Sequence, residues 1–160
     1  MQSCLLISVG GLSAPYYKQA VGEYEKRLQA FCRFKQIEVQ EERIDEKQAS
    51  EAVVQNALQK EGERILGMLP PKAQVIALCV EGKSMSSEEF AALLQQNAMY
   101  NGSIAFVIGS SHGLHENVKN RADMKLSGSA FTLPHQLCRV MLTEQIYRGY
   151  SIIAGQKYHK

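Results

Sequence analysis

The last residues of the chain concentrate side chains that can do chemistry. Lys157, Tyr158, His159 and Lys160 bring a phenol, an imidazole and two ammonium groups together at the C-terminus. A terminal segment is usually frayed and takes no part in chemistry. Because an imidazole can accept a proton and a phenol can donate a hydrogen bond, this tail is a candidate for substrate handling.

A long helical pattern leads into the tail. A short apolar segment, Ala130 to Leu133, is predicted to form a strand; the chain then turns at Pro134-His135, and a helix runs to about Ala154. Glu144 and Arg148 are spaced i, i+4 on this helix, and most such pairs only decorate a helix surface. For His135, beside the turn, a structural role and a catalytic role both stay open.

Another flank of the same helix mixes basic, aromatic and apolar side chains. Its members are Arg139, Thr143, Tyr147 and Tyr150, beside the apolar Leu137, Val140, Met141 and Ile152. A wide apolar face that also carries aromatic residues and arginine is typical of a subunit interface.

Three glycine-bearing loops follow predicted strands. They come after Val80, after Ile108 and around residues 128–134. Ligands of open α/β sheets bind at the carboxyl ends of strands, and glycine lets a ligand approach the backbone closely. Taken singly, each loop is more often a plain tight turn. Three after consecutive strands indicate one shared site.

The helices and strands that position these groups can be predicted from the spacing of the apolar residues. Short apolar or alternating runs predict strands, and 3.6-residue periodicity predicts helices. The expected strands cover residues 4–9, 33–40, 74–80, 103–108 and 125–133; the expected helices cover 15–28, 50–69, 86–101, 116–122 and 135–154. This alternation predicts an α/β fold, with a mostly parallel sheet flanked by helices, in a single domain over residues 1–160.

Local signals refine the expected helices and loops. Ser13 is placed to cap the first helix, and Ser86 with Glu89 forms a capping box. Pro70-Pro71 ends the second helix. Residues 41–48 are charged and poor in apolar side chains, so we expect a surface loop.

Composition excludes several classes of protein. A net charge of +2 argues against binding nucleic acid by charge alone, although an enzyme that visits folded RNA is not excluded. The four scattered cysteines lie among apolar neighbours, which favours buried, reduced thiols. The N-terminal segment lacks the basic region of a signal peptide, and its apolar run is too short to span a bilayer. We therefore expect a cytoplasmic protein without membrane association.

Familiar cofactor and catalytic motifs are missing. No G-x-G-x-x-G follows the first strand, and neither a P-loop nor a G-x-S-x-G elbow occurs. His112 and His115 have no nearby cysteine and are expected at the surface. The sequence therefore predicts no metal site.

The residues together resemble a known family. The chain is similar to the SPOUT-type methyltransferases of the bacterial ribosomal RNA large subunit methyltransferase H family, which methylate N3 of a pseudouridine. The similarity extends over essentially the whole chain. Its most specific parts are the PHQ…RV…EQ-x-YR run and the terminal Tyr-His-basic sequence; EYEKRL, KEGERIL, EGK, FVIG and TLPHQL also match. The resemblance implies a C-terminal trefoil knot, a feature that is very rare among proteins.

The resemblance also implies a cofactor and its site. S-adenosyl-L-methionine would lie in the knot, in contact with the residues that end two strands and with the segment before the last helix: Leu78, Gly109, Gly128, Ser129, Ala130, Phe131, Thr132 and Leu133. These residues belong to the same three loops. The chain departs from the family pattern at Cys79, Ser110 and Gly11, where an acidic residue, a glycine and a basic residue are common.

In the family, methyl transfer requires the imide proton of the base to leave. The resemblance assigns catalytic roles to His159, Arg139 and Tyr158, with Arg148 as a further anion-binding candidate, and leaves the identity of the general base open. It also implies a homodimer, in which one tail completes the partner's pocket, and the assembled ribosome as substrate. Two alternatives stay open: a ribosome-associated binding protein without activity, and a SPOUT methyltransferase that acts on transfer RNA.

Overall fold

A parallel sheet forms the centre of the molecule. The computed structural model describes all residues, 1–160, and its strands are β1 (Ser3–Val9), β2 (Arg33–Val39), β3 (Gln74–Ser84), β4 (Ser103–Ile108) and β5 (Met124–Ser127). Their order across the sheet is β2-β1-β4-β3-β5, and every neighbouring pair is parallel. The predicted α/β class is therefore confirmed, while the trefoil knot stays a prediction.

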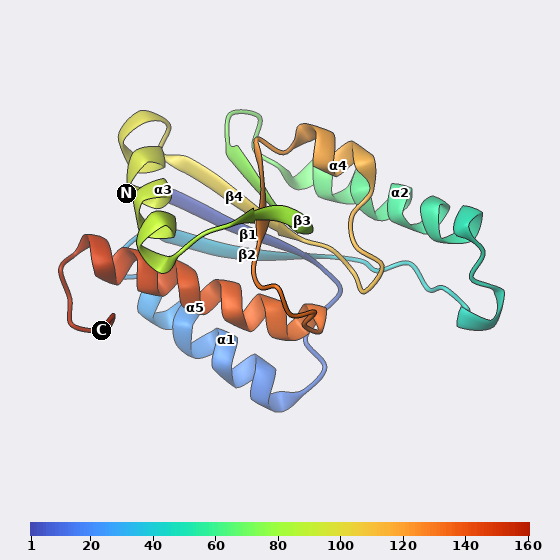
Figure 1. The fold of residues 1–160 in the computed structure, drawn as a ribbon, viewed down its shortest axis with the longest axis horizontal. Helices are drawn as coiled ribbons and strands as arrows, with labels where there is room; N and C mark the ends of the chain where they lie inside the picture. The colour runs from blue at the N-terminus through green and yellow to red at the C-terminus, as the bar shows by residue number, and fades with distance from the viewer.

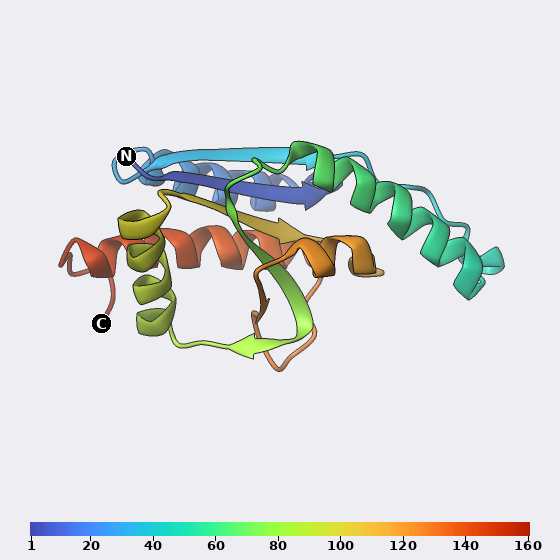
Figure 2. The ribbon, with the colours of Figure 1, turned by 90° about the horizontal axis from the view of Figure 1, so that it is seen from above.

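Helices cover both faces of the sheet (Figures 1 and 2). One face carries α1 (Pro15–Leu28), α3 (Ser87–Tyr100) and α5 (His135–Ile153), and the other carries α2 (Glu51–Met68) and α4 (Glu116–Arg121). A short 3-10 helix, η1 (Glu46–Gln48), lies in the predicted surface loop. Side chains alternate along β1, so that Cys4 and Leu6 join one core while Leu5 and Ile7 join the other.

Two predicted strand boundaries are wrong. Residues Ala130 to Leu133 form no strand, because β5 ends at Ser127 and nothing pairs with the chain beyond it. An apolar run forms a strand only where a neighbouring strand can satisfy its backbone. Strand β3 instead continues past Val80 to Ser84, and its pairing with β5 jumps in register between Leu78 and Lys83.

The predicted caps have different outcomes. The capping box of Ser86 and Glu89 is present at the start of α3, and Ser50 caps α2. Ser13 does not cap α1, whose N-cap is Ala14 without a side-chain hydrogen bond. The backbone N–H and the hydroxyl of Ser13 donate instead to Oε1 of Gln136, which ties the first loop to the start of α5. The four cysteines are free, although Cys138 is only partly buried.

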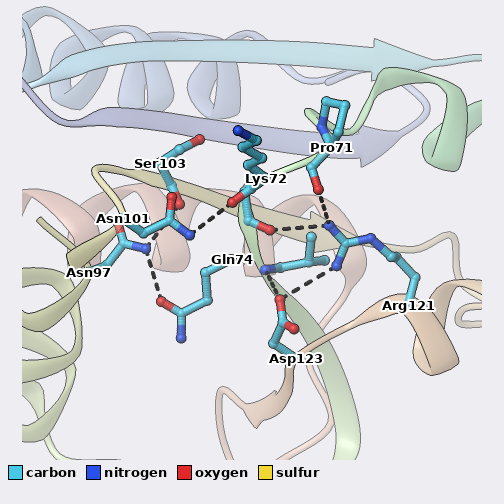
Figure 3. Close-up of polar contacts among 10 residues, drawn as sticks. Pro71, Lys72, Gln74, Asn97, Asn101, Ser103, Arg121 and Asp123 are labelled. Carbon is cyan, nitrogen blue, oxygen red and sulfur yellow. Dashed lines mark hydrogen bonds and ion pairs between the residues drawn. The ribbon is translucent and has the colours of Figure 1, made fainter.

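The amino ends of the strands are closed by side-chain hydrogen bonds (Figure 3). Asp123 accepts from the backbone N–H of Val75 at 2.8 Å, and Arg121 donates to the carbonyl of Ala73 at 3.2 Å. Asn97 donates to the side chain of Gln74 and to the carbonyl of Ser103. These contacts satisfy backbone groups where β3 and β4 begin.

Candidate functional site

The predicted loop after Val80 is wrong, because residues 81–84 continue strand β3. The middle of β3, the loop after β4 and the segment 128–134 surround one cavity. Its volume is about 710 Å³, within the range of small-molecule sites. Of the predicted residues, seven line it: Leu78, Gly109, Gly128, Ser129, Phe131, Thr132 and Leu133. Ala130 does not, although it lies within the same segment. The two loops and the middle of β3 therefore meet at one cavity, and binding of a ligand there stays a prediction.

Close packing of the backbone gives the cavity its shape. A Cβ at Gly109 would overlap the backbone carbonyl of Gly113, so the loop after β4 folds back on itself only with glycine there. Gly128 lies against the end of the Met141 side chain on α5. The loops therefore present backbone N–H and C=O groups to the cavity, and such groups can bind the edge of a purine.

The lining also includes residues that the sequence did not single out as ligands. Met141 and Cys138 enter from α5, one turn apart, and His135 lies at the start of that helix. Their spacing on one helical face was the available signal. Val80 and Phe131 are 86% and 83% exposed, which leaves two apolar side chains free for a ligand to cover.

The ionisable groups of the cavity offer no covalent nucleophile. Burial raises the pKa of the Cys79 thiol and, likewise, that of the Cys138 thiol, so both stay protonated at neutral pH. Lys119 lies 2.7 Å from Glu81, and this contact lowers the pKa of Glu81 and raises that of Lys119. The arrangement suits binding and positioning of a reactive ligand better than nucleophilic catalysis.

A buried carboxyl group lies on α2, beside the loop that precedes η1. Glu61 on α2 is 3% exposed, and its Oε2 accepts the backbone N–H of Glu42 at 2.9 Å, while its Oε1 has no partner. Burial raises the pKa of Glu61, and the hydrogen bond from the backbone N–H of Glu42 acts in the opposite direction. The Glu61–Glu42 contact joins α2 to the loop before η1. The loop after β4 contacts η1 separately, through His112, which lies 3.2 Å from Glu46.

The structure does not bring Arg139 into the cavity of its own chain. Its side chain is 8% exposed; Nε donates to Oε1 of Gln36 at 2.9 Å, and Nη1 donates to Oε2 of Glu38 at 2.6 Å. Both partners lie on β2. Arg139 therefore attaches α5 to the sheet on the flank away from the cavity.

The tail is ordered against the other end of α5. The Tyr158 hydroxyl donates to Glu144 at 2.9 Å, and the guanidinium of Arg148 lies 4.7 Å from the centre of the Tyr158 ring. Burial first, then hydrogen bonding with Tyr24 and Glu144, raises the pKa of Tyr158. His159 lies between Arg148 and Glu88 of α3. Neither Tyr158 nor His159 lines the cavity of its own chain.

Comparison with known proteins identifies the family. A family model described as predicted SPOUT methyltransferase matches residues 2–159. The chain belongs to this family. Members of the SPOUT family use S-adenosyl-L-methionine as methyl donor, and the residues around the cavity fit it: backbone groups for a purine edge, apolar side chains for its faces, and no competing nucleophile.

Close relatives cover nearly the whole chain. The ribosomal RNA large subunit methyltransferase H of Ligilactobacillus salivarius is 51% identical over 156 residues, which are 97% of this chain and 98% of that protein. The protein of the same name from Bacillus pumilus is 47% identical with the same coverage. A solved structure of a probable methyltransferase from Bordetella pertussis Tohama I has a TM-score of 0.56, with 16% identity and coverage of 93% and 94% of the two chains, and supports the fold alone.

No helix of this SPOUT chain combines the length and apolarity that crossing a membrane requires. No group of three or more potential metal-binding side chains occurs either.

Proposed function

We propose that this protein methylates N3 of a pseudouridine in large-subunit ribosomal RNA, with S-adenosyl-L-methionine as methyl donor. The observation that carries the proposal is the identity of about half of all residues, end to end, with proteins named ribosomal RNA large subunit methyltransferase H. The cavity supports it, because the residues carried over from the family for cofactor binding gather there. The cofactor supplies an electrophilic methyl group when bound.

The residues of the chain have separate tasks in this proposal. The segment 128–133 with Leu78 and Gly109 holds the cofactor, and the tail handles the base. The location of the tail supports a homodimer: α5 has 19 residues, about 28 Å of helix, and the tail packs near its far end. We therefore assign Tyr158 and His159 to the pocket of a partner subunit. The flank of α5 that carries Arg139, Thr143 and Tyr150 is buried within the chain, so the expectation that it forms the subunit interface is wrong.

The substrate in this proposal is the assembled ribosome, which places the protein in the cytoplasm. The net charge of +2 supports recognition by shape rather than charge, since an enzyme that binds naked RNA generally carries a stronger basic surface. We expect much slower methyl transfer to protein-free large-subunit RNA than to intact particles.

The direct test is methyl transfer from labelled cofactor to ribosomes that lack the modification. The full chain is compared with a chain truncated after Gln156, and cofactor binding is measured for both. We expect transfer by the full chain only, with equal cofactor binding. Equal transfer by both chains would contradict the role of the tail. Label in transfer RNA would favour the other substrate class, and binding to ribosomes without transfer would favour a binding protein.

A further inference from the structure

His159 is held between a cation and an anion. Its Nδ1 lies 3.1 Å from Nη1 of Arg148 on α5, and its Nε2 lies 2.8 Å from Oε1 of Glu88 in the first turn of α3. Arg148 is itself fixed by Glu144, whose carboxylate lies 2.6 Å from Nη2 of Arg148 and also accepts the hydroxyl of Tyr158. The imidazole is therefore oriented by residues of two helices.

These contacts decide which ring nitrogen carries the proton. An arginine side chain has only N–H donors and no acceptor, so Nδ1 of His159 must accept and carries the lone pair. An ionised carboxylate only accepts, so Nε2 must carry the hydrogen that Glu88 receives. An imidazolium would direct a second N–H at Arg148. The environment therefore favours the neutral Nε2–H tautomer.

Glu88 is well placed to remain ionised in this role. The hydrogen bond from His159 is the largest cause that lowers the pKa of Glu88. The N-terminus of a helix also favours a negative charge. The other hydrogen-bond partner of the ring is Arg148, which is itself paired with Glu144 on α5. Glu88 is the only carboxylate in contact with the ring.

We propose that Glu88 is a positioning residue that, together with Arg148, presents Nδ1 of His159 as the general base of the reaction. This inference rests on the proposed function. In the step, the N3–H bond of the substrate base breaks, an Nδ1–H bond forms, and the electron pair stays on N3. The N3–methyl bond would then form as the methyl–sulfur bond of the donor breaks and its electron pair stays on sulfur. The new imidazolium is stabilised by Glu88, and Arg148, displaced from Nδ1, becomes available as a donor to the imide anion.

The tautomer can be measured without substrate. In the uniformly ¹⁵N-labelled full chain at pH 8, the His159 signals are assigned by comparison with His159→Asn. We expect Nδ1 with a lone pair, a protonated Nε2, and a visible hydrogen-bonded Nε2 proton. That proton should be lost to solvent exchange in Glu88→Ala and retained in Glu88→Gln, whose amide oxygen still accepts. An Nδ1–H tautomer, or an unchanged Nε2 proton in Glu88→Ala, would overturn the proposal.

Kinetics distinguish positioning from a merely structural role. On ribosomes that lack the modification, we expect Glu88→Ala to lower kcat about 10²-fold and Glu88→Gln about 10-fold, with the Kd for S-adenosyl-L-methionine unchanged. Glu51→Ala is the matched control, since Glu51 is an exposed glutamate in the first turn of α2. We expect it to match wild type. Wild-type turnover by Glu88→Ala would overturn this inference alone. No transfer by the wild-type chain would overturn the proposed function and the base role together, whatever the tautomer.

Discussion

The two ends of the parallel sheet differ in how their backbone groups are satisfied. At the amino end, Asp123, Arg121 and Asn97 close the starts of β3 and β4 with side-chain hydrogen bonds. At the carboxyl end, glycine-bearing loops leave a cavity of about 710 Å³. The same strands thus carry a stabilising end and a binding end. The separation implies that substitutions at one end change the free energy of unfolding, and substitutions at the other change ligand binding.

The strongest test of the binding end is Gly109→Ala. The added Cβ would overlap the carbonyl of Gly113, so the loop after β4 must move. Because small displacements at a reacting site are costly, we expect kcat/KM for methyl transfer to fall on the order of 10²-fold. Calorimetric titration with S-adenosyl-L-methionine should show weaker binding, while the far-UV circular dichroism stays that of the wild type. Unchanged binding would remove this loop from the site.

The amino end is tested by Asp123→Ala. The backbone N–H of Val75 loses its acceptor, and we expect the free energy of unfolding to fall by about 1–2 kcal/mol, measured by urea denaturation. Asp123→Asn keeps an acceptor oxygen and should lose less. Cofactor affinity is expected to be unchanged in both variants. A loss of affinity comparable to that of Gly109→Ala would show that the two ends are coupled.

Glu61→Gln tests the buried carboxyl group of α2. Because the folded-state pKa of Glu61 is raised, its contribution to stability is full below the unfolded-state pKa and is lost as pH rises through the folded-state pKa. We expect the glutamine variant to be about 1 kcal/mol more stable than wild type at pH 8, and to lose less stability between pH 5 and pH 8. Urea denaturation at several pH values measures both. The same pH slope in variant and wild type would show that Glu61 does not titrate in the folded protein.

Gly22→Ala is the reference substitution, away from both ends of the sheet. Gly22 lies within α1, and nothing is within 4 Å of a Cβ added there. Alanine should therefore stabilise the protein by about 0.5–1 kcal/mol, with methyl transfer and cofactor affinity unchanged. A destabilised variant would indicate that this face of α1 is covered in solution, as the proposed homodimer allows.

The sequence predicts the sheet and its binding end better than the contacts made by the tail. Apolar runs located all five strands to within a few residues, except for the segment 130–133 and the extension of β3, where pairing rather than composition decides the boundary. The loop after β4 and the segment 128–134 could be predicted to meet, because parallel strands place their carboxyl ends together. The expected loop after Val80 could not, since residues 81–84 pair with β5.

The partners of the polar side chains could not be predicted in the same way. Arg139 meets residues about 100 positions away, at Gln36 and Glu38, and His159 meets Glu88 across 71 positions. Neither pairing follows a local period, because helix and strand periodicity describes neighbours within one element only. The burial of the Glu61 carboxyl group could not be predicted either, because the sequence of its helix has an ordinary amphipathic pattern.

The position of β1 in the sheet has a consequence for the order of assembly. β1 pairs with β2 on one side and with β4 on the other, so Ser3 lies opposite Arg33 and opposite Ser103. During synthesis, one edge of β1 therefore stays unpaired until about two-thirds of the chain has emerged from the ribosome. Such distant pairings slow folding, because the entropy cost of closing a long loop must be met before the stabilising contacts can form. A nascent chain arrested before Ser103 should expose that edge, and it would then be a substrate for chaperones.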